Sequence, residues 1–237
     1  MYPIKTLFLF LFLISIHLQV LDTTVFGEVQ KGSLKGKIIL SGALPLRESI
    51  EVKADPNVCG LTFQEESFVN SGNKGVKNAV ISLKSKSTAG SPVYPDDTVE
   101  ITSKNCRLEP HVFMVRLQEP VKIKNLDSIL HVLQFSTKDQ VLFNLPLPAG
   151  GNIIKKINES GLIQVKCLIH PFMKSIIAVM DTPYYVLSDH DGSFQLPEIE
   201  PGKYLLSIWH ESFGSMEKEI EIAPGRTLNL SFAFKKS

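Results

Sequence analysis

The sequence predicts an all-β protein, for three reasons. Short apolar runs rich in Val, Ile and Phe recur along the chain, and several alternate apolar with polar residues. Turn signals such as PAGG, HDGS and EPGK separate the later runs, and no long stretch shows the 3.6-residue period of an amphipathic helix. With 237 residues, 43% of them hydrophobic, the chain can bury the core of one or two domains. We therefore expect a sandwich or a Greek-key barrel.

The expected strands follow one another from the N-terminal half onward. They span residues 34–40, 78–85, 98–103, 111–117, 120–125 and 131–136. Two more strands, 161–167 and 174–180, bracket a short loop. Later turn signals predict further strands in the C-terminal part of the chain.

The N-terminus is typical of an export signal. Lys5 supplies the positive charge, and the apolar run LFLFLFLISI at 7–16 has the length of a signal-peptide core. Residues 1–27 are the expected signal, with the mature chain beginning near Glu28. An uncleaved membrane anchor is the alternative. Cleavage would leave a periplasmic or secreted protein with no stable membrane insertion, and the formal net charge of +1 argues against nucleic acid as the main partner.

Three cysteines, Cys59, Cys106 and Cys167, leave one thiol unpaired if the exported protein forms a disulfide. Cys59 and Cys106 lie in polar, turn-like surroundings. The economical pairing is a Cys59–Cys106 disulfide, with Cys167 kept as a thiolate. The alternative is that Cys106 is a reduced surface or core thiol.

The segment 164-QVKCLIHPFMKS-175 carries three soft donor atoms in one short loop, on Cys167, His170 and Met173. A fourth donor is expected from another strand end, and His131 opens the strand after a turn at 126–130. Two His, one Cys and a weak axial Met are the ligands of a blue-copper electron-transfer site. A bare C-x2-H could instead be half of a zinc site, but the chain has no C-x2-C or H-x3-H pair to complete it.

These segments resemble the copper-binding segments of cupredoxins. The stretches VKIKNLDSILHVLQF and VKCLIHPFMKSIIAV carry the likeness, which covers about residues 95–180, and the C-x2-H-x2-M loop is closest to amicyanin, whereas plastocyanin has a longer His-to-Met spacing. The resemblance implies one type 1 copper ion held by His131, Cys167, His170 and Met173. Val132 departs from the Asn of many members, although its backbone N–H remains available to the Cys167 sulfur.

The C-terminal part resembles a carboxypeptidase regulatory-like, transthyretin-like sandwich. The likeness rests on a D-x-D-G-x-F hairpin followed by P-G-x-Y, here Asp189, Asp191, Gly192, Phe194, Pro201, Gly202 and Tyr204. Upstream strands in 28–90 resemble the opening of the same family, so a cupredoxin domain at 91–180 is expected within a sandwich completed by 181–237. A cupredoxin with extra N-terminal strands and a small C-terminal module is the competing arrangement. Some exported proteins with this combination are called methylamine-utilisation-like.

Three functions follow from these expectations. The first is single-electron transfer, with the ring edge of His170 presented between Pro171 and Phe172 to a redox partner protein. The second is copper storage or delivery, and the third is a non-redox binding module. The sequence shows no nucleophile–base–oxyanion set, so a non-enzyme is expected.

Two further sites have alternative interpretations. His111 follows Pro110 at a strand start and is either a structural histidine, an extra copper ligand or a redox gate. The run Trp209, His210 and Glu211 is either a packed corner or a second metal or partner site.

Overall fold

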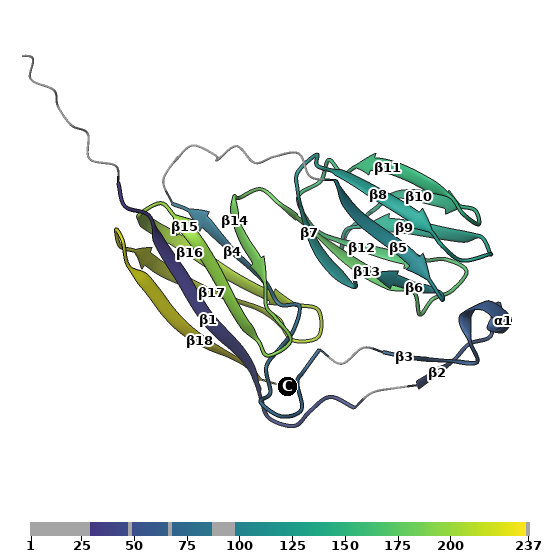
Figure 1. Cartoon of the computed structure of the whole chain (residues 1–237), viewed down its shortest axis with the longest axis horizontal. Coiled ribbons are helices and arrows are strands. Elements are labelled where there is room, and N and C mark those ends of the chain that lie inside the picture. Colours follow the sequence, from purple (N-terminus) through teal and green to yellow (C-terminus); the bar gives the residue numbers. More distant parts are fainter. Residues whose placement is uncertain (1–28, 47–48, 66–67, 87–97, 236–237) are drawn as a thin grey trace, which may run out of the picture.

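The computed structural model describes residues 29–46, 49–65, 68–86 and 98–235 (Figure 1). The predicted export signal at 1–27 lies outside these residues. In the described part, regular structure consists of β-strands apart from one helical turn, α1 (Pro56–Cys59). The all-β prediction is confirmed. None of the described helices has the length and apolar composition needed to cross a membrane.

The central part of the chain forms a two-layered sandwich, here called the insert sandwich. One sheet has the strand order β10-β9-β12-β13-β7 and the other the order β11-β8-β5-β6. Their bounds are β5 Val99–Lys104, β6 Arg107–Glu109, β7 Val112–Arg116, β8 Pro120–Asn125, β9 His131–Ser136, β10 Val141–Leu147, β11 Asn152–Lys156, β12 Gly161–Cys167 and β13 Lys174–Met180. Alternate residues of β8 and β9 are buried, and Ile123 and Phe135 meet in one core between the layers.

Strands from both sides of the insert form a second sandwich, here called the split sandwich. Its sheets have the orders β15-β1-β18 and β14-β4-β16-β17. Their bounds are β1 Gly32–Ser41, β4 Val80–Ser85, β14 Tyr184–Leu187, β15 Ser193–Ile199, β16 Gly202–His210, β17 Gly214–Ile222 and β18 Thr227–Lys235. β1 pairs parallel to β18 and antiparallel to β15, while β4 lies between β14 and β16. Segments before and after the insert therefore share one apolar core, which includes Ile38, Ile81 and Leu206.

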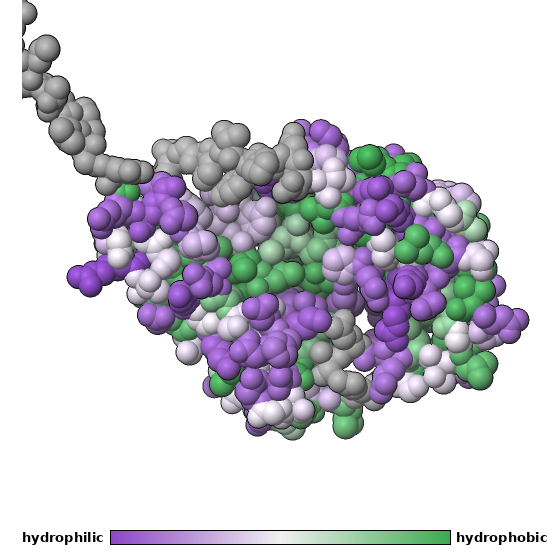
Figure 2. Space-filling model, viewed as in Figure 1, coloured by the Kyte–Doolittle hydropathy of each residue, from purple (hydrophilic) through white to green (hydrophobic). Residues whose placement is uncertain are grey.

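The two sandwiches meet along a small apolar seam. Val80 of the split sandwich packs there with Val112 and Ile176 of the insert, and Trp209 lies partly buried against them. On the face seen in Figure 2, apolar residues gather between the two sandwiches and polar residues cover much of the outer surface. Trp209 is thus part of the packing between domains, as the packed-corner interpretation expects.

A third structural unit links the sandwiches, and we call residues 49–64 the cap segment. It contains β2 (Ser49–Glu51), α1 and β3 (Thr62–Gln64), and β2 pairs antiparallel with β3. Figure 1 shows it reaching from the split sandwich to the far end of the insert. Val52 is buried in the insert core and Phe63 packs against it. Sequence analysis assigned this segment to the N-terminal strands and did not predict that it covers the insert.

A disulfide between Cys59 and Cys106 ties the cap segment to the insert, as predicted. The Cα atoms are 5.0 Å apart and the two residues are separated by 47 positions. On the chain-entropy estimate, closing a loop of that length stabilises the folded state by roughly 4 kcal/mol. Cys167 is the free cysteine among the three, and it is buried.

Candidate metal centre

The pairing of β9 with β12 brings His131 and Cys167 to the same end of the insert sandwich. Cys167 lies opposite Leu133, two residues after His131. The loop after Cys167 returns into β13, where Lys174 pairs with Lys166. Two backbone hydrogen bonds close this loop, from the Met173 N–H to the His170 carbonyl at 2.9 Å and from the Cys167 N–H to the Met173 carbonyl at 3.1 Å. His170 is therefore held over the strand ends that carry the other two donors.

The three predicted donors His131, Cys167 and His170 converge in a buried spot. The Cys167 Sγ lies 3.8 Å from Nδ1 of His131 and 3.6 Å from Nδ1 of His170. The two Nδ1 atoms are 3.2 Å apart. Both histidines are 0% exposed and Cys167 is 1% exposed. This is one of three groups of His, Cys and acidic donors among the described residues whose ligand atoms lie within 4.8 Å of one another.

Each histidine of this centre is held from outside by a carboxylate. The Nε2 of His131 is 2.9 Å from Asp127 Oδ2, and the Nε2 of His170 is 3.0 Å from Asp55 Oδ2. A carboxylate accepts a hydrogen bond, so these contacts favour protons on both Nε2 atoms and leave the two Nδ1 atoms as the nitrogens that could bind a metal. The two Nδ1 atoms face each other and the Cys167 sulfur, and in the metal-free protein a proton on Nδ1 of His131 is shared with that sulfur. Such a group of donors attracts a cation, and a carboxylate behind a ligand histidine is usual in metal sites.

Asn125 holds the turn that carries Asp127. Its Oδ1 accepts from the Asp127 N–H at 2.9 Å, and its Nδ2 donates to the carbonyls of Ile129 and Leu147 at 2.7 and 2.9 Å. Asn125 is buried, so these bonds replace its hydration. The sequence motif N-L-D-x3-H at 125–131 therefore contains both the turn former and the partner of the first histidine.

The environment of Cys167 favours the thiolate. Burial alone would raise the pKa of this thiol, but a hydrogen bond with His131 and backbone N–H groups of His170, Ile169 and Val132 together lower its pKa to about 6. The expected role of the Val132 backbone is thus present. For His131, burial opposes the charged ring, while the contacts with Cys167 and Asp127 outweigh burial and raise its pKa. Thiolate character is what a metal-binding or reactive cysteine requires.

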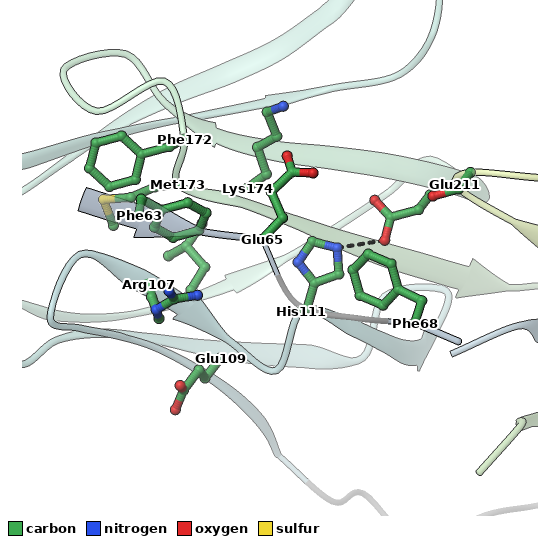
Figure 3. A pocket seen from close by; sticks show the side chains of 12 residues that line it. Phe63, Glu65, Phe68, Arg107, Glu109, His111, Phe172, Met173, Lys174 and Glu211 are labelled. Atoms are coloured by element: carbon green, nitrogen blue, oxygen red, sulfur yellow. Dashed lines mark hydrogen bonds and ion pairs between the residues drawn. The ribbon is translucent and has the colours of Figure 1, made fainter. Parts of the chain in front are cut away.

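Met173, the fourth predicted donor, is fully buried in the core that holds Cys167. It also lines a cleft of about 240 Å³ between the cap segment and both sandwiches. Figure 3 shows Met173 beside Phe172 and Phe63 at one end of this cleft, with His111 and Glu211 at the other. Arg107 lies over the Phe63 ring at 4.1 Å and donates to the Gln64 carbonyl at 2.9 Å, so the cap closes this end of the cleft.

The exposed ring edge expected at His170 is not present in this structure. Asp55 of the cap segment covers the ring, whose exposure is 0%. Phe172, expected on the docking surface, is only 9% exposed because it packs on Phe63 with ring centroids 4.9 Å apart. Pro171 does remain exposed. The expectation failed for His170 and Phe172 because their covering residues are more than 100 positions away in sequence.

The other two histidines singled out in the sequence form a separate junction pair, His111 and His210. The Nε2 of His111 is 2.6 Å from Glu211 Oε1, and its ring stacks on Phe68 at 4.9 Å. The Nε2 of His210 donates to the Lys77 carbonyl at 3.1 Å, and its Nδ1 accepts from the Ser212 N–H at 3.1 Å. Neither belongs to a group of three candidate metal donors among the described residues. The structural interpretation of both is favoured.

Asp55 and Asp127 are the residues of the centre that sequence analysis did not assign. Asp127 stands four positions before His131, a spacing that could have drawn attention to it. Asp55 lies 115 positions from His170, and no local pattern predicts their contact.

The comparisons with known proteins concern the fold. No family model matches the sequence, and no curated protein matches it. Solved structures with similarity include a purple cupredoxin from Nitrosopumilus maritimus, at 23% identity over 35% of this chain and 99% of that one, with a TM-score of 0.32. Amicyanin from Paracoccus versutus matches at 18% identity over 42% of this chain and 97% of that one, with a TM-score of 0.33.

A copper-containing nitrite reductase from Thermus scotoductus matches at 19% identity over 42% of this chain and 25% of that one, with a TM-score of 0.33. Likenesses with such TM-scores carry no argument about function, which rests on the side chains of the centre. No comparison bears on the transthyretin-like resemblance of the split sandwich, so that resemblance stays a prediction.

Proposed function

We propose that this chain is an exported type 1 copper protein that carries single electrons between redox partners. The observation that carries the proposal is the convergence of two imidazole Nδ1 atoms and one thiol of lowered pKa in a buried spot, with the opposite ring nitrogens bound to carboxylates. Two imidazoles and one thiolate suit copper in both of its common oxidation states. We propose a carrier rather than an enzyme.

In this proposal His131, His170 and Cys167 would hold the copper ion, and Met173 would be a fourth, weaker donor. When bound, copper supplies reversible one-electron chemistry between Cu(II) and Cu(I). The protein keeps the three donors in place in both states, because Asp127 and Asp55 fix the two rings and strand pairing fixes the cysteine. The burial of all three would exclude water from a bound ion.

The redox partner is proposed to dock at the end of the insert sandwich that carries the ligand loop. Leu168 and Ile169 are 46% and 36% exposed there, and Pro171 is exposed beside them. Transient complexes between redox proteins bury little surface area. A small apolar surface of this kind therefore suits brief association with a protein partner.

The test is the absorption spectrum of the purified protein loaded with one equivalent of Cu(II). Thiolate-to-Cu(II) charge transfer should give an intense visible band, and ascorbate should bleach it reversibly without loss of metal. A protein that holds stoichiometric Cu(II) without this band would contradict the type 1 assignment.

Copper delivery is the second candidate, and the cap segment favours it. The cap covers the ring of His170, the residue expected to face a redox partner. In a protein that delivers copper, a cover over the site would slow the release of the ion before the acceptor binds. The two functions are separated by mixing the Cu(I) form with a thiol-rich acceptor protein. Delivery predicts copper transfer faster than spontaneous release, together with slow electron exchange.

A further inference from the structure

The disulfide of the cap segment lies directly against the candidate metal centre. The sulfur atoms of Cys59 and Cys106 and a ring nitrogen of His170 all lie within 4.8 Å of one another. The Cys106 sulfur also forms such a group with Asp127 and His131. A structural bridge whose only role was to tie the cap down could sit anywhere along its contact with the insert. This one adds two sulfur atoms to a cluster that already holds a thiol and two imidazoles.

A disulfide offers no thiolate, but its reduced form offers two. An external dithiol can supply the electrons: its thiolate attacks Cys59 Sγ, the sulfur of the pair whose residue is partly exposed, and Cys106 leaves as a thiolate. The second thiol of the reductant then displaces Cys59. The reductant ends as a disulfide, and two electrons and two protons have moved to the protein cysteines. Two adjacent thiolates select soft ions such as Cu(I).

We propose that reduction of the Cys59–Cys106 disulfide creates a second, outer site for Cu(I), formed by these two thiolates beside His170. The site goes beyond the proposed electron transfer, because it makes metal binding depend on the thiol redox state of the protein. Cys106 is fully buried, so the outer ion would be shielded from water on the side of the insert core.

His170 belongs to both this outer site and the inner site, which is the centre formed by His131, Cys167 and His170. Its Nδ1 faces Cys167 at 3.6 Å, while its Nε2 faces Asp55 at 3.0 Å. Asp55 and Cys59 belong to the same turn, since the Cys59 N–H donates to the Asp55 carbonyl at 2.9 Å. A neutral imidazole has one lone pair and so serves one metal at a time. The ring therefore ligates the inner ion when the inner site is full, and it can complete the outer site when the inner site is empty.

The experiment measures Cu(I) stoichiometry by anaerobic competition with a chromogenic Cu(I) chelator. The wild-type protein is assayed with its disulfide intact and again after reduction by a water-soluble phosphine that is then removed. We expect about one bound equivalent in the oxidised protein and about two in the reduced protein. An unchanged stoichiometry after complete reduction, verified by thiol titration, would overturn the outer site.

Two variants and one chemical modification test whether Cys59 and Cys106 bind the additional equivalent of Cu(I). In the reduced Cys167→Ser protein, the inner site is damaged while the reduction-dependent equivalent should persist. In the double variant C59S/C106S, reduction should add nothing. Because that variant lacks a stabilising bridge, alkylation of the reduced wild type after the inner copper is loaded gives the same control without mutation. An extra equivalent that survives in both controls would contradict the assignment.

The same measurements separate this inference from the proposed function. If the oxidised protein binds no copper, the inner site fails whatever happens on reduction. If it binds one equivalent with the expected colour and reduction adds none, only the outer site fails.

Discussion

The molecule contains two pairs of histidines in similar surroundings, but the two pairs differ in what their rings contact. His131 and His170 of the metal centre are buried, and each has a carboxylate on Nε2. His111 of the junction pair also binds a carboxylate through Nε2, and His210 is as deeply buried as the two histidines of the centre. The difference lies in the other partners of each ring: in the centre both Nδ1 atoms face a thiol, whereas in the junction the rings have backbone or aromatic partners.

The pKa directions separate the two pairs in the same way. Burial dominates at His210 and lowers its pKa to about 4, so this ring is neutral near neutral pH. At His131, contacts with Cys167 and Asp127 outweigh burial and raise the pKa. Burial and a nearby carboxylate are therefore poor indicators of a metal ligand. Convergence of ring Nδ1 atoms on a thiol is the more specific sign.

The largest expected difference between the pairs is in colour. Cys167→Ser should abolish the visible band of the copper-loaded protein, because the band needs a thiolate bond to Cu(II). His210→Gln, which alters the junction, should retain the band. Absorption spectra of both variants with one equivalent of Cu(II) decide this, and a band that persists without Cys167 would refute the site.

The second-largest difference is expected between Asp127 and Glu211, in their effect on copper affinity. Asp127→Asn weakens the partner of a ligand ring and is expected to lower copper affinity by about 10- to 100-fold. Glu211→Gln makes the same chemical change beside His111 and should leave affinity unchanged. Competition titration with a copper chelator measures both. Equal losses in the two variants would mean that the effect is general destabilisation.

The third difference concerns the thiol in the metal-free protein. The folded pKa of Cys167 is about 6 against 9.0 for the ordinary thiol, so the thiolate should persist down to about pH 6. The stabilisation from this lowered pKa is complete above pH 9.0 and is lost as the pH falls through about 6. Thiolate absorbance, with Cys167→Ser as blank, follows the titration. His131→Gln should move its midpoint upward, and an ordinary midpoint in the wild type would contradict the geometry.

The junction should lose stability in a more acidic range than the metal centre does. His210 binds protons more weakly in the folded state, with a pKa of about 4 against 6.5, so stability should fall as the pH is lowered from 6.5 toward 4. The full penalty is on the order of 3 kcal/mol. His210→Gln should flatten this part of the profile relative to the wild type. Urea unfolding of metal-free protein across this range measures it, and parallel profiles would show that another group is responsible.

The smallest effect is expected at Met173. Met173→Leu should keep copper and colour but raise the reduction potential, because Cu(II) loses a weak donor that Cu(I) needs less. Each tenfold change in the relative affinity for the two oxidation states corresponds to about 59 mV. Protein-film voltammetry measures the shift. An unchanged potential would place the thioether outside the coordination of the metal.

The sequence predicted those parts of the fold and the site that local patterns determine. Strands such as 120–125 and 131–136 came from β-branched content and alternation, and their burial patterns follow that alternation. Cys167 and His170 could be found because they share one loop with Met173. The cap segment could not be found, because the pairing of Asp55 with His170 depends on a tertiary contact across 115 residues. Even the correct disulfide pairing did not reveal that its sulfurs lie beside the candidate donors His131 and His170.

The parallel pairing of β1 with β18 has a consequence for biosynthesis. Ser33 and Thr227 lie side by side although 194 residues separate them in the chain. During translation or export, the edge of β1 that pairs with β18 therefore stays unpaired until nearly all of the described chain has emerged. The strands of the insert sandwich, in contrast, are complete by Met180. Long-range pairing is slow to form, and unpaired edges invite intermolecular association. The insert sandwich is thus expected to fold first, and the split sandwich only after β18 has emerged.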